Sequence, residues 1–235
     1  MANNGYTDKI VMSIGGSLIV PNGGIDSQFL KELNEFIREE LAKNKNRQFF
    51  LIAGGGMTTR NYQAAARNVL GHQLTADDLD WIGVHATRLN GHLLRTIFRD
   101  IAHPIIIDDY SIIQKPVERV IIGAGWKPGW STDYDAVLVC EDYGVKTIIN
   151  LSNISRVCDK DPKKFKDAKP IDKITWTNFR KLISGKWTPG MNAPFDPIAA
   201  KRAQGLGIKV VLMGKDFKNI RSYLKGKSFV GTMIG

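Results

Sequence analysis

The chain has 235 residues, enough for one large domain or two small ones with a sizeable core. Hydrophobic residues make up 43% and charged residues 24%, the proportions of a globular protein, and no apolar run is long enough to span a membrane. The first residues lack the basic start and apolar core of a signal peptide, so we expect a cytoplasmic protein with no membrane partner. Cys140 and Cys158 are not spaced as a metal site and are expected to be reduced thiols.

The formal net charge of +10 fits either a nucleic-acid partner or small anionic ligands. The thickest basic run, residues 160–169, is interrupted by acids and lacks the alternating aromatic residues of a nucleic-acid platform, so a solvated loop is favoured there. We therefore expect no nucleic-acid partner. The basic surface is better explained as one that concentrates anionic small molecules such as nucleotides.

Apolar runs and turn-rich segments alternate along the chain. Strands are expected at residues 9–14, 49–53, 104–107, 120–122, 147–151, 209–213 and 229–234. Helices are expected after a cap at Asp26 or Ser27, after Thr58 and Thr59, from 77 towards 98, after Ser131, near 177–183 and, behind a flexible loop at 187–197, after Pro197. No internal repeat or linker requires two domains.

Glycine follows several of the expected strands. The clearest case is Gly54-Gly55-Gly56, which ends an apolar run; Gly15-Gly16, Gly123 to Gly125 and Gly214 follow other runs. Glycine lets a backbone approach a phosphate, and the first amides of a helix attract an anion, to which Arg60 could add a bidentate contact. One glycine triplet alone is as often only a tight turn. Repeated glycine at strand ends predicts an open α/β sheet with ligands along the carboxyl edge.

Two further segments carry candidate binding groups. The polar loop at 126–133 leads into a helix, so its end is a second N-terminus suited to an anion. Trp126 and Trp130 could stack on a ligand, anchor an oligomer or fold over the core. On the helix before it, His85, Arg88 and His92 could share one face. They could bind a metal or phosphate, but packing is favoured because no carboxylate orients them.

Five motifs, in order, resemble those of the amino acid kinase superfamily and, within it, the UMP kinases of archaeal type. The resemblance spans essentially the whole sequence, from Ile14 to Ile234. The motifs are Gly54-Gly55-Gly56 with Arg60; Asp80-Trp81-Ile82-Gly83 with Thr87-Arg88; Pro128-Gly129 with Thr132-Asp133; Ser152-Asn153 with Asp161-Pro162; and Asp196-Pro197 with Lys201.

The resemblance implies a three-layer αβα sandwich with a mainly parallel open sheet, the carbamate kinase-like fold. One domain would cover residues 1–235, with an acceptor-nucleotide half at about 1–133 and an ATP half at about 134–235. The implied activity is the ATP-dependent phosphorylation of UMP to UDP in pyrimidine nucleotide synthesis, with Mg²⁺. A homo-oligomer, by family analogy a hexamer, is also implied.

Roles for individual residues follow from the same resemblance. The catalytic group would be Gly15, Gly16, Ser17, Arg60 and Asp133. UMP would be held by Gly55, Asp80 at its ribose, and the loop residues Trp126, Lys127, Pro128, Gly129, Trp130, Ser131 and Thr132. ATP would be held by Gly15, Gly16, Gly56, Arg60, Ser152, Asn153, Cys158 and Asp161. Phosphoryl transfer needs two anions held in line with their charge neutralised, which opposed glycine turns can supply without a general base or a resident metal site.

The chain departs from the family pattern near the ATP segment. Ser155-Arg156 stands where Asp-Gly is usual, Cys158 where an aromatic residue is usual, and Ser13 where many members of the superfamily have a lysine. Loss of that aspartate could slow catalysis, or Arg156 could enter the site as a replacement cation. The acceptor loop also has Trp126 and Trp130 where smaller or more polar residues are typical. Two alternatives therefore stay open: another small-molecule kinase on the same fold, with an acceptor pocket remodelled by these tryptophans, or a nucleotide-binding protein that has lost turnover.

Overall fold

The computed structural model describes residues 5–162, 164–183 and 193–235, and within them the centre is a seven-stranded sheet of order β3-β2-β1-β4-β8-β9-β7. β9 runs antiparallel to β8, and every other neighbouring pair is parallel. The predicted α/β fold with a mainly parallel open sheet is confirmed. The strands are β1 (Asp8–Ile14), β2 (Arg47–Ala53), β3 (Val120–Gly123), β4 (Thr147–Leu151), β7 (Lys173–Ile174), β8 (Lys209–Met213) and β9 (Thr232–Ile234).

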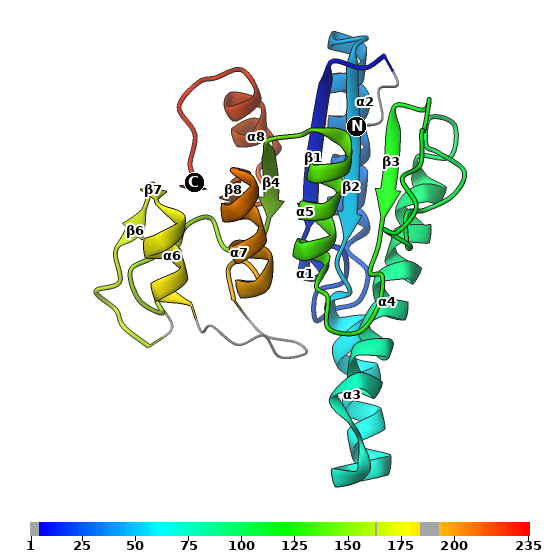
Figure 1. The fold of residues 1–235 in the computed structure, drawn as a ribbon, viewed down its shortest axis with the longest axis vertical. Coiled ribbons are helices and arrows are strands. Elements are labelled where there is room, and N and C mark those ends of the chain that lie inside the picture. The colour runs from blue at the N-terminus through cyan, green and yellow to red at the C-terminus, as the bar shows by residue number, and fades with distance from the viewer. Residues whose placement is uncertain (1–4, 163, 184–192) are drawn as a thin grey trace.

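Helices cover both faces of the sheet, which gives three layers (Figure 1). One face packs against α2 (Ser27–Lys43), α4 (Ala76–Ile97) and α8 (Phe217–Leu224); the other packs against α5 (Thr132–Tyr143), α6 (Trp176–Leu182) and α7 (Pro197–Leu206). Successive strand residues point to opposite faces, so Val11 and Met12 enter different apolar clusters. The continuous apolar runs in the sequence follow from this double burial.

Shorter elements complete the chain. They are α1 (Gly16–Ile19), α3 (Gly56–Leu70), the 3₁₀ turn η1 (Gly71–Gln73), and a small antiparallel pair of β5 (Val157–Cys158) with β6 (Pro170–Ile171). Figure 1 shows α3 and the first half of α4 extending beyond the end of the sheet. In the parts of the chain that the structure describes, no helix is long and apolar enough to cross a membrane. The cysteines Cys140 and Cys158 are free thiols, as predicted.

Side chains fix where several helices begin. The carboxylate of Asp26 accepts a hydrogen bond from the Phe29 N–H at 2.9 Å, and that of Asp196 accepts one from the Ala199 N–H at 2.7 Å. Ser131 caps α5 in the same way, through the Tyr134 N–H. The prediction that Thr58 and Thr59 open a helix was wrong: α3 begins at Gly56, behind an N-cap at Gly55 without a side-chain bond.

Two predicted strands were also wrong in part. Residues 104–107 form no strand, because Pro104 has no N–H and Ile105 is 62% exposed; isolated bridges join only Ala102 to Val120 and Ile107 to Gly123. The last strand is confined to β9, three residues long. Most of the predicted loop at 187–197 lies outside the described residues.

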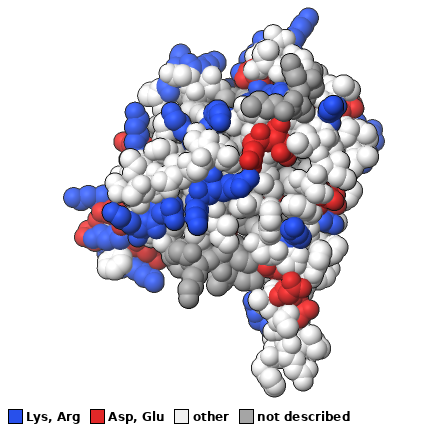
Figure 2. All heavy atoms as spheres, in the orientation of Figure 1, with Lys and Arg blue, Asp and Glu red and all other residues white. Residues whose placement is uncertain are grey.

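Basic residues gather on the face of the molecule formed by α6 and α7 (Figure 2). The exposed basic residues of these helices are Arg180, Lys181, Lys201 and Arg202. Arg202 is paired with Glu141 at 2.6 Å. These residues carry part of the net charge of +10, and a basic surface of this kind attracts small anions.

Candidate functional site

Two glycine turns meet at the carboxyl ends of β1 and β2. The Gly54 N–H donates to the Ile14 carbonyl at 3.0 Å, and the Gly15 N–H donates to the Leu151 carbonyl of β4 at 2.8 Å. A Cβ atom placed on Gly16 would lie only 2.6 Å from the Gly55 nitrogen and 2.7 Å from the Gly54 carbonyl carbon. The glycines are therefore required by backbone packing, and the contact brings both turns to the edge of one cavity.

This cavity has a volume of about 300 Å³ and lies along the carboxyl edge of the sheet, as predicted. It is bordered by β1, β2 and β4 together with the N-terminal ends of α3 and α5. The predicted site residues that line it are Gly15, Gly16, Ser17, Gly55, Gly56, Arg60, Asp80, Trp130, Ser131, Thr132, Asp133, Ser152 and Asn153.

Other predicted site residues do not reach the cavity wall. Trp126, Lys127, Pro128 and Gly129 lie on the loop that leads to it. On the ATP side, Cys158 lies in β5 and Asp161 follows it, so neither is brought into the cavity.

Arg156 does not lie in the cavity wall either. Its Nη1 is 3.0 Å from Asp172 Oδ1, on the segment before β7. In this structure the hypothesis that Arg156 serves as a replacement cation is therefore not met, because an ion pair directs its guanidinium elsewhere.

Asp133 is the most strongly held carboxylate in the cavity. Its Oδ1 accepts from Ser13 Oγ at 3.1 Å and from Asn150 Nδ2 at 3.4 Å, and its Oδ2 accepts from the Asp196 N–H at 3.0 Å. Burial, with the nearby charge of Asp196 second, raises the pKa of Asp133 to about 7. Asn150 was not predicted as a site residue, although it is the second-last residue of β4, an apolar strand that ends at this edge of the sheet.

Helix α4 holds the backbone of the cavity on the side of β2 and β3. Asn90 Nδ2 donates to the carbonyls of Gly54 at 2.7 Å and Gly55 at 3.1 Å, and the Thr87 hydroxyl accepts from the Gly125 N–H at 2.8 Å. Asp80, nearer the start of α4, accepts from the Gly129 N–H at 2.8 Å, and burial raises its pKa. One helix thus orients both glycine segments.

Arg88 extends the same arrangement. Its guanidinium donates to the carbonyls of Trp126 at 2.8 Å, Asp108 at 3.0 Å and Gly125 at 3.1 Å. Within residues 5–162, 164–183 and 193–235, no group of three or more His, Cys, Asp or Glu side chains is placed to hold a metal ion. The favoured interpretation, packing, describes Arg88: it fastens the loop that follows β3.

The loop itself carries an aromatic cluster. The ring centroids of Trp126 and Trp130 are 4.9 Å apart, and those of Trp130 and Tyr134 are 4.4 Å apart, both in edge-on geometry. Lys127 Nζ lies 4.0 Å from the Trp126 ring centroid and 4.9 Å from that of Trp130. The tryptophans therefore pack on each other, and of the two only Trp130 borders the cavity.

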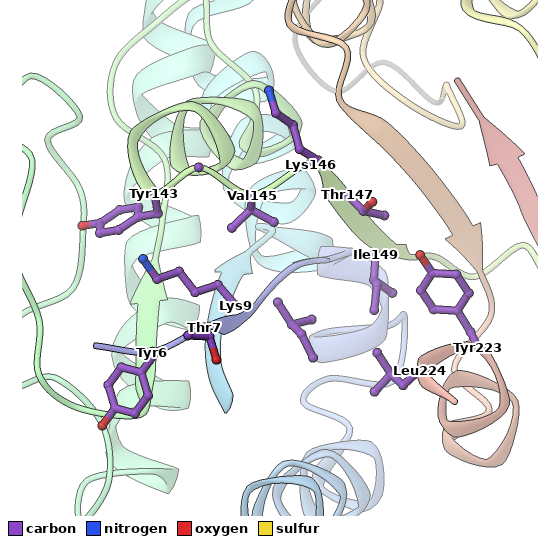
Figure 3. Close-up of a pocket in the computed structure, with 12 residues that line it drawn as sticks. Tyr6, Thr7, Lys9, Tyr143, Val145, Lys146, Thr147, Ile149, Tyr223 and Leu224 are labelled. Carbon is purple, nitrogen blue, oxygen red and sulfur yellow. The ribbon is translucent and has the colours of Figure 1, made fainter. Parts of the chain in front are cut away.

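A second cavity, of about 440 Å³, lies at the amino ends of β1 and β4, away from the glycine turns (Figure 3). Two of its tyrosines bond to other segments of the chain: the Tyr6 hydroxyl donates to the Val117 carbonyl, and the Tyr143 hydroxyl donates to the Gln114 carbonyl, both at 2.9 Å. Lys146 is directed out of the cavity, with Nζ 3.4 Å from the Leu206 carbonyl. These groups fasten neighbouring segments, so the cavity at the glycine turns is the candidate active site.

A model of the amino acid kinase family matches residues 8–214, a span that contains every side chain placed in the candidate site above. The chain belongs to the amino acid kinase family. The uridylate kinase of Thermoplasma volcanium is 33% identical over 233 residues, covering 97% of each chain. That of Thermococcus kodakarensis is 32% identical, covering 96% of this chain and 99% of its own.

Solved structures agree with this assignment. The crystal structure of uridylate kinase from Archaeoglobus fulgidus superposes with a TM-score of 0.80 at 30% identity, covering 97% of this chain and 100% of the other. The UMP kinase of Bacillus anthracis superposes with a TM-score of 0.76 at 18% identity, which supports the fold alone. The predicted resemblance to the amino acid kinase superfamily and its three-layer fold is confirmed.

For a member of the amino acid kinase family, this site has a clear chemical use. Two glycine turns without side chains face one cavity, and an exposed guanidinium, Arg60, lies on its wall. The Arg60 guanidinium contacts Met57 Sδ at 3.8 Å, and no acid among the described residues pairs with it. Its charge is available to a phosphate.

Proposed function

We propose that this protein is a UMP kinase that forms UDP and ADP from UMP and ATP, the reaction of pyrimidine nucleotide synthesis. The observation that carries the proposal is the contact between the turns at Gly15-Gly16 and Gly54-Gly56 within one cavity. A kinase must hold two phosphates next to each other, and two touching glycine turns provide adjacent anion sites. The names and near-complete coverage of the uridylate kinase relatives support UMP as the acceptor.

The proposed reaction is an in-line transfer. A phosphate oxygen of UMP attacks the γ-phosphorus of ATP, the bond to the bridging oxygen of the β-phosphate breaks, and ADP leaves. The attacking oxygen already carries negative charge, so no general base is needed. Backbone amides at Gly16, Gly55 and Gly56 and the guanidinium of Arg60 would neutralise the moving group, while Gly15, whose N–H is bonded to the Leu151 carbonyl, would hold the turn in place.

Substrate selection is assigned to the two sides of the cavity. On the acceptor side, Gly55 would hold the UMP phosphate, Asp80 the ribose hydroxyls, and the loop from Trp126 to Thr132 the base. On the donor side, Ser152 and Asn153 would approach the ATP nucleoside, and Asp133 would order the site through Ser13. The acceptor half at about 1–133 and the ATP half at about 134–235 both contribute lining residues. Cys158 and Asp161 remain predicted ATP contacts that lie outside the cavity wall.

We propose that Mg²⁺ enters this site as part of its substrate, the Mg-ATP complex. The described residues offer no ready-made cluster of three or more metal-ligating side chains. Mg²⁺ commonly keeps several waters and binds largely through substrate phosphates, which suits a site of this kind.

A homo-oligomer, by analogy a hexamer, is proposed from the exposed apolar side chains on α3 and α4. Val69 is 82% exposed, Tyr62 67% and Leu89 62%, and burying such side chains between subunits would stabilise an assembly. Light scattering during gel filtration would measure the subunit number. A cytoplasmic location is proposed as well, consistent with the two free thiols.

A coupled assay of ADP release tests the function. Full-length protein with Mg-ATP would be offered UMP, CMP, dUMP and isopentenyl phosphate in turn, with ATP alone as the blank. Turnover that is fastest with UMP supports the proposal. Faster turnover with another acceptor would favour a different kinase on this fold, and calorimetric UMP binding without ADP release would favour a binding protein.

A further inference from the structure

Asn90, in the second half of α4, is a buried polar residue whose side-chain amide reaches the glycine triplet. It is 3% exposed, and its Nδ2 donates to the Gly54 carbonyl at 2.7 Å and to the Gly55 carbonyl at 3.1 Å. An asparagine amide has two N–H donors, so both can be used on consecutive carbonyls of one turn. Asn90 itself does not border the cavity, whereas both glycines do. It therefore holds the turn from behind.

The peptide bonds of the triplet convert this hold into a direction for their amides. In a planar trans peptide the carbonyl and the following N–H point in opposite directions, and the described residues contain no cis peptide. Because the carbonyls of Gly54 and Gly55 point towards Asn90, the N–H groups of Gly55 and Gly56 point away from it. All three glycines border the cavity and Asn90 does not, so the side away from Asn90 is the cavity side.

The two amides so directed are not used by the fold. The neighbouring N–H groups of Gly54 and Met57 donate to carbonyls of other segments, at 3.0 Å and 2.9 Å. Those of Gly55 and Gly56 have no acceptor within the described parts of the chain. They stand at the start of α3, where the first N–H groups lack partners inside the helix and attract an anion. Arg60, one turn further along α3, borders the same cavity.

We propose that Asn90 is a positioning residue for phosphate binding: by fixing two carbonyls of the glycine triplet, it presents the Gly55 and Gly56 amides as a paired receptor for the acceptor phosphate. Asn90 touches no substrate and acts through the turn. Without its two hydrogen bonds these peptides could rotate, and a misaligned donor binds a phosphate much more weakly. The inference rests on the proposed function where it takes UMP as the acceptor.

Substitutions at Asn90 test whether its amide acts on the phosphate. Asn90→Leu has a similar volume and no donor, and Asn90→Ser keeps a hydroxyl that can donate to one carbonyl. Each variant would be titrated with UMP and with uridine, which lacks the phosphate. Binding would be followed in ¹H–¹⁵N NMR spectra, which measure weak as well as tight ligands, and the thermal midpoint would be recorded.

Asn219→Leu is the matched control, since Asn219 also holds main chain through its side-chain amide. It donates to the Val230 carbonyl and accepts from the Val230 N–H, both at 2.7 Å, and it lies outside the cavity wall. This variant should bind UMP and uridine as the wild type does, whatever its thermal midpoint.

We expect Asn90→Leu to raise the UMP Kd by about tenfold or more, because hydrogen bonds to a charged phosphate are strong and depend on alignment. Its uridine Kd should stay close to the wild-type value, and the UMP Kd of Asn90→Ser should lie between those of the wild type and Asn90→Leu. A purely structural role would weaken both ligands alike.

Two results in Asn90→Leu would overturn the inference: an unchanged UMP Kd, or an equal loss of UMP and uridine affinity. If Asn90→Leu does not fold, Asn90→Ser decides by the same comparison. If neither variant folds, Asn90 serves the fold and the inference fails.

The proposed function and this inference can fail separately. A wild-type protein that releases no ADP with UMP would refute the proposed function. Inorganic phosphate then serves as the probe, because it requires no particular acceptor. The amide signals of Gly55 and Gly56 should move when it is added to the wild type and move less in Asn90→Leu. Signals that stay in place in the wild type, or that move equally in both proteins, would overturn the role of Asn90.

Discussion

The main chains of Gly16 and Gly56 touch, so neither position has room for a side chain. A Cβ atom on Gly56 would overlap the Gly16 carbonyl, and Gly56 adopts φ = +64°, which L side chains rarely accept. This contact ties the turn after β1 to the turn after β2. In the proposed reaction these are the donor and acceptor phosphate sites, so their spacing is set by backbone packing.

Gly16→Ala should therefore damage both the fold and the reaction. We expect a loss of about 1–3 kcal/mol in unfolding free energy, typical of overpacking, with a larger relative loss of UMP-dependent turnover. Gly205→Ala is the control, because a Cβ there meets nothing within 4 Å inside helix α7. That change should stabilise the protein by about 0.5–1 kcal/mol and leave turnover unaltered. Urea unfolding measures the stability of each variant, and the ADP-release assay measures its turnover. Equal stability and equal turnover of Gly16→Ala and Gly205→Ala would contradict the account.

Asp80 should control UMP binding in two ways. Its carboxylate would bind the ribose hydroxyls, and it holds the acceptor loop by accepting a hydrogen bond from the Gly129 N–H at 2.8 Å. Asp80→Ala loses both contacts and should raise the UMP KM strongly while leaving the ATP KM nearly unchanged. Asp80→Asn keeps an oxygen for the Gly129 N–H, so its KM should lie between those of wild type and Asp80→Ala. Steady-state kinetics decide; an unaltered UMP KM in Asp80→Ala removes the ribose assignment.

The pKa of Asp133, about 7 against an ordinary 3.8, predicts how stability depends on pH. Between these values the folded carboxyl keeps a proton that the unfolded chain has released. This contribution to stability is therefore complete below pH about 4 and is lost as the pH rises through about 7. The urea midpoint of the wild type should fall from pH 5 to pH 8.

Asp133→Asn is the variant that checks this origin. It should flatten the decline only in part, because Asp135 and Asp196 also have raised pKa values, caused first by burial. If the urea midpoint of Asp133→Asn falls with pH as steeply as that of the wild type, Asp133 is not the source of the pH dependence.

Glu40 should matter for stability and not for catalysis. It is 4% exposed, and its oxygens lie 2.6 Å from Arg47 Nη1, 2.8 Å from Lys43 Nζ and 3.3 Å from Arg221 Nε, which joins α2, β2 and α8. Removing one partner of a buried pair costs about 3–5 kcal/mol, so Glu40→Ala should unfold at much lower urea concentration with an unchanged UMP KM.

The exposed pair of Arg38 and Asp100 offers the matched comparison for Glu40. Its shortest separation is 2.7 Å, but Asp100 is 56% exposed at its side chain. Asp100→Ala should lower the urea midpoint far less than Glu40→Ala does, because solvent screens an exposed ion pair. A loss as large as that of Glu40→Ala would refute the distinction between the buried and exposed pairs.

Local signals explain which parts of the fold could be predicted. The caps at Asp26, Ser131 and Asp196 lie beside the helices they start, and a glycine after an apolar run marks a strand end. α8 was missed although Asp216 caps it, because eight residues hold too few apolar repeats to stand out. At residues 104–107 the apolar run was misleading, since Pro104 and the exposed Ile105 prevent regular pairing.

The candidate site also contains some residues that local sequence could predict and others that it could not. Its glycine turns and Asp133 could be predicted because each lies next to a strand end or a helix start. Asn90 and Asn150 could not, because their bonds to Gly54 and Asp133 cross 36 and 17 residues of sequence and exist only once the sheet has formed. The burial of Asp135 is likewise a tertiary property that no local pattern reveals.

The most direct test of the central claim is ³¹P NMR of the full-length protein with Mg-ATP and UMP. The account predicts that the ATP γ-phosphate signal falls while the β-phosphate signal of UDP grows in equal amount, and that neither change occurs without UMP. A spectrum that stays constant over hours, or loss of the γ-signal into inorganic phosphate alone, would contradict phosphoryl transfer to UMP in this cavity.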